Sequence, residues 1–319
     1  MNLYEEIQQF LIESEQRANR PLLTILGPTG SGKTALSIKL AKVFNGEIIS
    51  ADSRQIYKHM DIGTDKIPEM KQEGITHHLL DIADPKDEFT LSDYKRMATK
   101  AINEIHTRRK LPILCGGTGL YINTIIENYQ LPQIPPQVEL RQKLAQYYEE
   151  NGAEALHKLL EECDPETAAK IHPNNVRYVV RALEINMVSG QTKRDLKGDR
   201  LFNVFSIGID WPREELYERI NRRVDDQIAR GLLNEVKSLL LRGYNEKIPS
   251  MSSLGYLELV EYIKGGCSLE AATEMIKQNT RNYAKRQMTW FRRYKDVYWI
   301  PGQELENMLN LDLKNSINN

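Results

Sequence analysis

Residues 27–34 read GPTGSGKT, and few stretches of eight residues restrict a fold so strongly. They match the P-loop pattern G-x-x-x-x-G-K-[ST] and comprise Gly27, Pro28, Thr29, Gly30, Ser31, Gly32, Lys33 and Thr34. The glycines allow backbone N–H groups to approach phosphate oxygens closely, and Lys33 supplies a positive charge for the same phosphates. The Thr34 hydroxyl is suited to ligate Mg²⁺. We therefore predict a phosphate-binding loop. The loop alone does not specify the reaction, because kinases, ATPases and GTPases share it.

The sequence around the loop predicts alternating strands and helices. An apolar run at 22–26 reads as a buried strand, a helix follows at about 33–44, and 47–50 reads as a second strand. This is the βαβ pattern of a parallel sheet. Further strands are expected at 111–115, 204–209 and 297–300, and further helices at the N-terminus, 92–109, 214–242 and 269–293. The tail after Gly302 is polar and is expected to fray.

A helical region separates the third and fourth expected strands. From Leu120 to about Arg200 the pattern is helical, it is punctuated by prolines, and it contains no clear strand. We predict an α/β fold with a P-loop NTPase-like parallel sheet flanked by helices and an all-helical insertion domain. The core domain would comprise residues 1–120 and 201–319, and the insertion residues 121–200.

Composition narrows the cellular setting. The formal net charge is −1, so a nucleic-acid partner would have to meet a local basic patch. Three widely spaced cysteines, Cys115, Cys163 and Cys267, form no CxxC pair, which favours a reducing cytoplasm over a disulfide framework or a zinc site. No stretch is long and apolar enough for a membrane span, and the N-terminus lacks the apolar core of a secretory signal. We expect a cytoplasmic monomer.

Two further positions follow expected strands. Asp52 comes directly after the second strand and Thr118 after the third. Ligands bind outside the carboxyl ends of strands in open α/β sheets, so both side chains are expected near the phosphate loop. An aspartate there can accept a proton or bind a metal, but it can equally cap a helix. The Thr118 hydroxyl can bond a phosphate or a nucleophile, although the glycines before it also suit a simple turn.

A Walker B strand, an apolar run that ends in aspartate, is not evident. The nearest candidate, 75–81, is interrupted by His77 and His78, which weakens an assignment as a motor ATPase or a GTPase. The two histidines could form a metal pair. Adjacent histidines without chelating spacing more often pack or cap, so we do not expect a metal there.

A basic segment near the C-terminus alternates with aromatic residues. Residues 281–295 read RNYAKRQMTWFRRYK and contain no acid. On a helix, Arg281, Lys285 and Arg292 would lie near one face, which could follow a phosphate backbone. A solvated helix face is the competing interpretation. A second basic cluster, with Lys193, Arg194, Lys197 and Arg200, closes the helical region.

Several long segments together resemble the bacterial tRNA dimethylallyltransferases, also known as tRNA isopentenyltransferases. The matching segments are GPTGSGKT, ISADSRQIYKHMDIGTDK, LLDI with FTLSDY, ILCGGTGLY, IHPNNVRYVVRALE and TRNYAKRQMTWFRR. They occur in the family's order between residues 23 and 300. The resemblance implies transfer of the five-carbon group of dimethylallyl diphosphate to N6 of the adenosine 3′ of the anticodon. The tRNAs would be those that read codons beginning with U.

The resemblance also implies roles for individual residues. Asp52 would accept the N6 proton and contact the base, Thr118 would contact the diphosphate, and Arg223 would clamp it, with the neighbouring Arg222 easily confused with it. The loop residues 27–34 would hold the diphosphate, with Mg²⁺ on Thr34. Contacts to the tRNA anticodon stem-loop would come from Asp52, Ser53, Arg54, Gln55, Arg177, Tyr178, Val179, Val180 and Arg181, and the basic segment adds Arg281, Lys285 and Arg293.

The sequence departs from the family at two points, and rival functions stay open. Leu257 follows Gly255-Tyr256 where many relatives have lysine, and the C-terminal zinc finger of eukaryotic members is absent, so no zinc is expected. The closest rival is an adenylate isopentenyltransferase that acts on free AMP or ATP. A small-molecule P-loop kinase is a second rival, and an RNA-binding module with a vestigial loop is a third. The helical insertion and the basic helix favour tRNA, since a free nucleotide needs neither.

Overall fold

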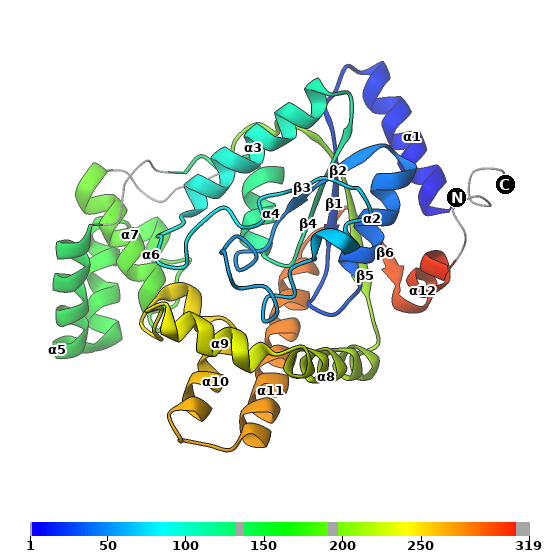
Figure 1. The fold of residues 1–319 in the computed structure, drawn as a ribbon. Coiled ribbons are helices and arrows are strands. Elements are labelled where there is room, and N and C mark those ends of the chain that lie inside the picture. Colours follow the sequence, from blue (N-terminus) through cyan, green and yellow to red (C-terminus); the bar gives the residue numbers. More distant parts are fainter. Residues whose placement is uncertain (1, 132–136, 191–196, 311–319) are drawn as a thin grey trace. The chain divides into compact units, whose positions relative to one another are not determined.

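The computed structural model describes residues 2–131, 137–190 and 197–310 of the 319-residue chain. It divides into two compact units, Met1–Ile126 with Arg200–Asn319, and Glu127–Asp199. The larger unit contains the sheet, and the smaller unit is helical in the residues described (Figure 1). No helix in the described ranges is long and apolar enough to cross a bilayer.

The sheet of the larger unit has six parallel strands in the order β3-β2-β4-β1-β5-β6. Their bounds are β1 Pro21–Leu26, β2 Gly46–Ser50, β3 His77–His78, β4 Leu111–Gly116, β5 Asn203–Asp210 and β6 Val297–Pro301. β1 lies between β4 and β5, with Leu26 opposite Gly116 on one side and Gly208 on the other. The P-loop therefore begins at the carboxyl end of an interior strand, with the ends of β4 and β5 on either side.

Both faces of the sheet are covered by helices, as the apolar strand sequences require. On β1, Leu23 and Ile25 pack into one core with α1, α2 and α12, while Leu22 and Leu26 pack into a second core with α3 and α4. The helices are α1 Leu3–Gln16, α2 Lys33–Val43, α3 Leu91–Thr107, α4 Gly119–Ile126 and α12 Gly302–Asn310. Burial of both faces fixes the strand register, because a shift of one residue would exchange the two cores.

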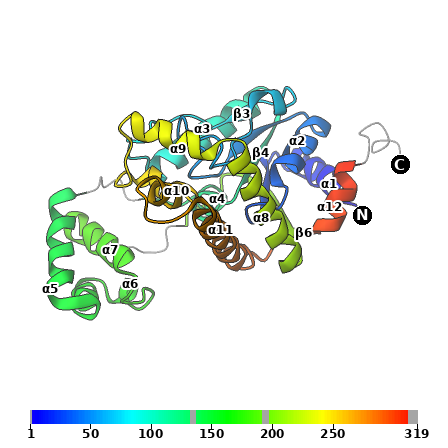
Figure 2. The ribbon, with the colours of Figure 1, turned by 60° about the horizontal axis from the view of Figure 1, so that its bottom comes forward.

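Four more helices pack against one another beside the sheet (Figure 2). They are α8 Arg213–Ala229, α9 Leu232–Leu241, α10 Tyr256–Ile263 and α11 Leu269–Phe291, and two 3₁₀ turns, η1 Glu69–Lys71 and η2 Pro249–Ser252, lie in the connecting loops. A third apolar core, with Tyr256 at 0% exposure, joins these helices to the loop after β2. The segment that carries Asp52 is therefore supported by helices from the C-terminal third of the chain.

The smaller unit consists of α5 Val138–Cys163, α6 Pro165–Ala168 and α7 Val176–Ser189. Gly152, with φ of +83°, interrupts α5 with a conformation that a residue with a Cβ rarely adopts. α5 and α7 pack through a small apolar core that includes Leu156 and Leu183. Glu184 is fully buried and is neutralised by Arg141 and Arg181, which lower its pKa.

The structure confirms the parallel α/β sheet and corrects the sequence prediction at four places. The histidine pair forms the short edge strand β3, which polar sequence concealed. The helix expected over 214–242 is two helices, because Gly231 adopts a φ of +99°. The described part of the tail after Gly302, residues 303–310, belongs to α12 and buries Leu305. Residues 121–126, which were expected in the insertion, belong to the sheet unit because α4 buries its apolar side chains there.

Candidate active site

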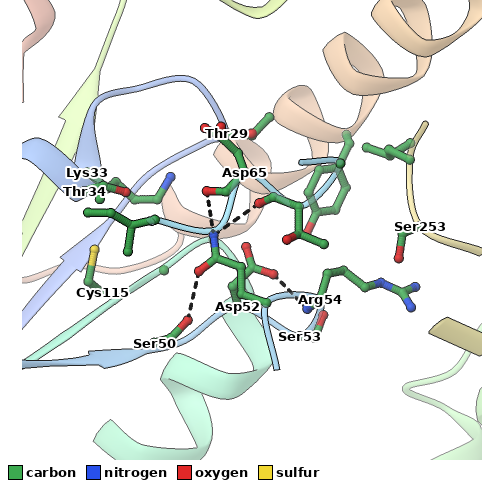
Figure 3. A pocket seen from close by; sticks show the side chains of 18 of the residues that line it. Thr29, Lys33, Thr34, Ser50, Asp52, Ser53, Arg54, Asp65, Cys115 and Ser253 are labelled. Carbon is green, nitrogen blue, oxygen red and sulfur yellow. Dashed lines mark hydrogen bonds between the residues drawn. The ribbon is translucent and has the colours of Figure 1, made fainter. Parts of the chain in front are cut away.

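A cavity of about 380 Å³ opens at the carboxyl ends of β1, β2 and β4. Its walls come from the P-loop, the loop after β2, the end of β4, and helices α8 and α11. Figure 3 shows Lys33, Asp52 and Asp65 together around this cavity. The site therefore combines residues from both halves of the chain, on either side of the helical insertion.

The P-loop presents only part of its length to the cavity. Thr29, Lys33 and Thr34 line it, whereas Gly27, Pro28, Gly30, Ser31 and Gly32 do not. Gly30 and Gly32 have φ of +77° and +94°, so the turn requires glycine at both positions. The Lys33 ammonium donates to the Pro28 carbonyl at 2.6 Å. The Lys33 side chain therefore folds back over the P-loop.

The pKa of Lys33 is lowered to about 8. Burial is the main cause, Cys115 and Asp52 act in the opposite direction, and the positive charge of Arg223 adds to the lowering. An anion bound beside Lys33 would favour its charged form. Lys33 and Arg223 therefore bring two positive charges to the same cavity, where Asp52 and Asp65 offset part of that charge.

Side chains distant in sequence hold the P-loop from outside. Arg219 on α8 donates to the Gly30 carbonyl at 3.1 Å, and the indole N–H of Trp211 donates to the Ser31 carbonyl at 3.0 Å. Gln287 on α11 accepts from the Thr29 N–H at 2.9 Å and donates to the Gly117 carbonyl at 2.9 Å. Gln287 thus joins the P-loop to the end of β4. Sequence reasoning did not identify it, and its place among basic residues gave no signal of this role.

Residues 52–55, which follow β2 and Ala51, are arranged by hydrogen bonds within the turn and to Thr64 and Thr118. The Asp52 carboxylate accepts the Arg54 N–H at 2.8 Å, and the Ser53 N–H donates to the Thr118 hydroxyl at 3.0 Å. Gln55 donates to the Thr64 carbonyl at 3.2 Å. All four residues line the cavity. The Asp52 carboxylate is held by the turn and makes no ion pair within the described part of the chain.

Thr118 lies next to Ser53 and contacts Tyr283. It is not among the residues that line the cavity, and its hydroxyl instead supports Ser53. Tyr283 on α11, which the sequence did not single out, does line the cavity. Burial raises the pKa of Tyr283 to about 12, with a further contribution from the charge of Asp52. Its phenol is therefore a neutral hydrogen-bonding group near Asp52.

Arg223 lines the cavity, whereas the neighbouring Arg222 is exposed and does not. The Arg223 guanidinium lies 3.3 Å from the Asp65 carboxylate. Asp65 also lines the cavity and bonds Arg230 at 2.8 Å. The geometry thus distinguishes the two adjacent arginines and adds an acidic residue that the sequence did not reveal.

The predicted RNA contacts of the helical unit differ in accessibility. Arg177 and Tyr178 are exposed, and Arg181 bonds the buried Glu184. Val179 is 0% exposed and belongs to the apolar core of this unit, so its side chain is not accessible to an RNA. Val180 packs partly against the same core. The prediction took a contiguous stretch of α7, a helix with one face towards the core and another towards solvent.

The basic residues of segment 281–295 have different surroundings, and Arg292, after α11, lies 3.7 Å from Asp210. Arg281 turns towards α8 and donates to the Asn221 side chain at 2.6 Å. Lys285 and Arg293 instead line a second hollow of about 550 Å³, together with Arg286 and Trp290. Arg281 is therefore committed to the contact between helices. In the second basic cluster, Lys197 pairs with Glu127 at 3.1 Å, and Lys193 and Arg194 lie outside the described residues.

The histidine pair serves the sheet edge. His78 bonds Glu47 at 2.7 Å, and Glu47 also pairs with Arg108 and Lys110. His77 lines the cavity and contacts the Ile75 carbonyl through Nδ1. Among the described residues, no group of three or more His, Cys, Asp or Glu is arranged to hold a metal. A divalent ion bound by Thr34 would need most of its ligands from substrate oxygens and water, which is the usual manner of Mg²⁺.

Known proteins match this chain over most of its length. The profile of the IPP transferase family matches residues 55–294. The tRNA dimethylallyltransferase of Acetivibrio thermocellus is 48% identical over 291 residues, which cover 90% of this chain and 93% of that protein. That of Thermomicrobium roseum is 46% identical over 282 residues, covering 88% and 86%.

Solved structures agree in fold. The full-length tRNA isopentenylpyrophosphate transferase from Bacillus halodurans is 42% identical, with a TM-score of 0.68 and coverage of 91% of this chain and 95% of that chain. A eukaryotic dimethylallyltransferase acting on tRNA is 31% identical, with a TM-score of 0.74 and coverage of 90% and 75%. The chain belongs to the IPP transferase family.

Proposed function

We propose that this chain is a tRNA dimethylallyltransferase. In the proposed reaction, N6 of an adenosine 3′ of the anticodon forms a bond to the allylic C1 of dimethylallyl diphosphate. The bond from C1 to the bridging oxygen breaks, the diphosphate leaves with the electron pair, and the N6 proton is released. The proposal is carried by sequence identity of 46–48% to tRNA dimethylallyltransferases over most of the chain, combined with a cavity lined by Lys33, Asp52 and Arg223.

The basic side of the cavity suits a diphosphate leaving group. Negative charge accumulates on the bridging oxygen as the allylic bond breaks, so groups already aimed at that oxygen stabilise the transition state. Lys33 and Arg223 are close enough that the charge of Arg223 lowers the pKa of Lys33. An anion between them would relieve that repulsion. We propose that these two cations and the P-loop N–H groups bind the diphosphate.

Asp52 suits the role of proton acceptor. An amine attached to an aromatic ring is a weak nucleophile, and it gains from a base within hydrogen-bond reach. The Asp52 carboxylate lines the cavity and makes only the local bond to the Arg54 N–H in the described chain. We assign Thr118 a supporting position, since its hydroxyl holds Ser53 at 3.0 Å.

Mg²⁺ is part of the proposal. The exposed Thr34 hydroxyl lines the cavity beside Lys33 and could contribute one ligand. Bound there with diphosphate oxygens, the ion would neutralise leaving-group charge. The protein groups identified above act independently of it, because Lys33 and Arg223 bind and orient the diphosphate.

The RNA surface of the proposed enzyme is basic and aromatic. Lys285, Arg286 and Arg293 line the second hollow with Trp290, and basic side chains of this kind bind phosphates while aromatic rings stack on bases. On the helical unit, Arg177 and Tyr178 are the exposed candidates. We further propose a cytoplasmic monomer, which the free thiols Cys115, Cys163 and Cys267 support by indicating a reducing compartment.

The deciding experiment uses radiolabelled dimethylallyl diphosphate, Mg²⁺ and unmodified tRNA with adenosine 3′ of the anticodon. Parallel reactions contain AMP or ATP in place of tRNA. Label in tRNA alone supports the proposal, whereas label in AMP or ATP indicates an adenylate isopentenyltransferase. Label in none of the three acceptors contradicts transfer altogether.

The Asp52→Asn variant tests the base assignment in the same assay. It keeps the size and the turn acceptor, so turnover should fall by about 100-fold or more while tRNA affinity changes less than about twofold. Undiminished turnover would remove Asp52 from the role of base.

A further inference from the structure

The cavity contains two carboxylates with different surroundings. Asp52 is held by the Arg54 N–H at 2.8 Å, and it has no cationic partner within the described ranges. Asp65 lies between two guanidinium groups, those of Arg223 at 3.3 Å and Arg230 at 2.8 Å. Similar carboxylates in unlike settings commonly have unlike roles. Asp52 is available to a substrate proton, whereas Asp65 is committed to the arginine that faces the diphosphate site.

The contact is asymmetric. One Asp65 oxygen faces Arg223, which lines the cavity, and the other faces Arg230, which does not. The shorter distance is the one to Arg230. Arg223 is thus held by a carboxylate that an incoming anion can rival, and Arg230 offsets part of that carboxylate's charge from outside the cavity.

The backbone holds Asp65 in this place. Its φ is +51°, a left-handed conformation that aspartate and asparagine tolerate better than most residues with a Cβ. The preceding turn is fixed because Glu235 on α9 accepts the N–H groups of Asp61, Ile62 and Gly63 at 2.7–3.1 Å. Gln227 on α8 donates to the Ile62 carbonyl at 2.9 Å. The Asp65 carboxylate is therefore presented to the arginines by a braced loop.

We propose that Asp65 positions Arg223 and limits the affinity of the site for diphosphate, so that the product can leave. This rests on the proposed function, in which diphosphate is the leaving group. A negative charge beside the binding arginine repels an anion that carries several charges, and it competes for the same guanidinium. The carboxylate that orients Arg223 also keeps product binding reversible.

The test measures binding of inorganic diphosphate with Mg²⁺ by titration calorimetry, which requires neither tRNA nor catalysis. Asp65→Asn keeps the shape and the left-handed backbone but removes the charge, so diphosphate should bind about tenfold tighter. Product inhibition of prenylation by diphosphate should strengthen in parallel. Loss of a merely structural contact would change affinity in the opposite direction.

Two further variants isolate the mechanism. Asp61→Asn is the matched control, because it removes the same charge from the same loop, where the carboxylate bonds Lys66 instead. It should change diphosphate affinity by less than about twofold. Arg230→Gln leaves the Asp65 charge less compensated and should weaken diphosphate binding by about threefold. That effect should disappear when Asp65→Asn is also present.

Each outcome decides between the claims. Unchanged or weaker diphosphate binding by Asp65→Asn overturns the assignment of Asp65, as does equal tightening by Asp61→Asn. An effect of Arg230→Gln that persists without the Asp65 charge contradicts the coupling. Failure of the wild-type protein to bind diphosphate at all would instead refute the proposed diphosphate site, and it is recognisable before any variant is compared.

Discussion

Replacement of Gln287, which lines the cavity, should loosen the P-loop. Gln287 is 7% exposed, and its amide bonds the Thr29 N–H and the Gly117 carbonyl, both at 2.9 Å. Methionine fills a similar volume but makes neither bond, which leaves one donor and one acceptor unsatisfied. An unsatisfied buried group costs about 1–3 kcal/mol, so Gln287→Met should destabilise the sheet unit by about 3 kcal/mol. For a unit of this size, that lowers the midpoint of thermal unfolding by about 6–12 °C.

Gln287→Glu keeps one of the two hydrogen bonds and makes the other dependent on pH. A glutamate still accepts the Thr29 N–H, but an ionised oxygen would face the Gly117 carbonyl, and only a protonated carboxyl can donate there. The folded protein should therefore raise the pKa of this carboxyl above its unfolded value. The native state then binds the extra proton, so its stability is retained at low pH and lost as pH rises through the raised pKa.

The assay compares thermal unfolding of wild type, Gln287→Met and Gln287→Glu at pH 5 and pH 8 by circular dichroism. The glutamate variant should lose more of its midpoint between pH 5 and pH 8 than either of the others. A methionine variant within about 2 °C of wild type would show that the bridge is not structurally important. A pH response equal to that of wild type would refute the argument about the Gly117 carbonyl.

Three further predictions address charge and anchoring. Diphosphate affinity should fall as pH rises through about 8, because Lys33 has a pKa near that value and only its charged form attracts the anion. Lys33→Arg should remove this pH dependence. A fall in diphosphate affinity near pH 8 that persists in the variant would show that another group titrates there. Lys285→Gln should reduce the salt slope of tRNA binding by about 0.7–0.9, while Arg281→Gln, on the face turned to α8, should leave it unchanged. Glu235→Ala removes the acceptor of three N–H groups at 61–63 and should destabilise the protein by about 3 kcal/mol. Thermal unfolding measures this loss. An unchanged midpoint would show that solvent replaces the Glu235 carboxylate as acceptor.

The strands that sequence identified share one property, which is an apolar run closed by glycine or polar residues. β1, β2, β4, β5 and β6 all have it, whereas β3 consists of two histidines and depends on pairing with β2. Edge strands need only one partner and little apolar sequence, so composition could not reveal β3. Similarly, the break between α8 and α9 depends on one left-handed glycine, Gly231, within an otherwise helical pattern.

The same distinction holds for the candidate site: residues with a local sequence pattern could be predicted, and residues brought in from distant segments could not. The P-loop is a local pattern, and Asp52 follows from the rule that ligands bind at strand ends. Arg223 required the family resemblance, because nothing in its own neighbourhood separates it from Arg222. Tyr283 and Gln287 come from α11, which begins more than 230 residues after the P-loop, so only the fold could bring them to the cavity.

Substitutions far from the cavity in sequence should affect the site, because the two halves of the chain contribute different parts of it. The N-terminal half supplies the P-loop, Asp52 and Asp65, and side chains of the C-terminal helices hold the P-loop and the turn before Asp65 in place: Arg219 bonds the Gly30 carbonyl, Gln287 bonds the Thr29 N–H, and Glu235 accepts N–H groups of that turn. Each of these bonds is made to backbone, so each restricts where a phosphate-binding or acidic group can lie. Substitutions on α8, α9 and α11 that never meet a substrate should therefore change diphosphate affinity first and tRNA affinity only where the exposed basic face is altered.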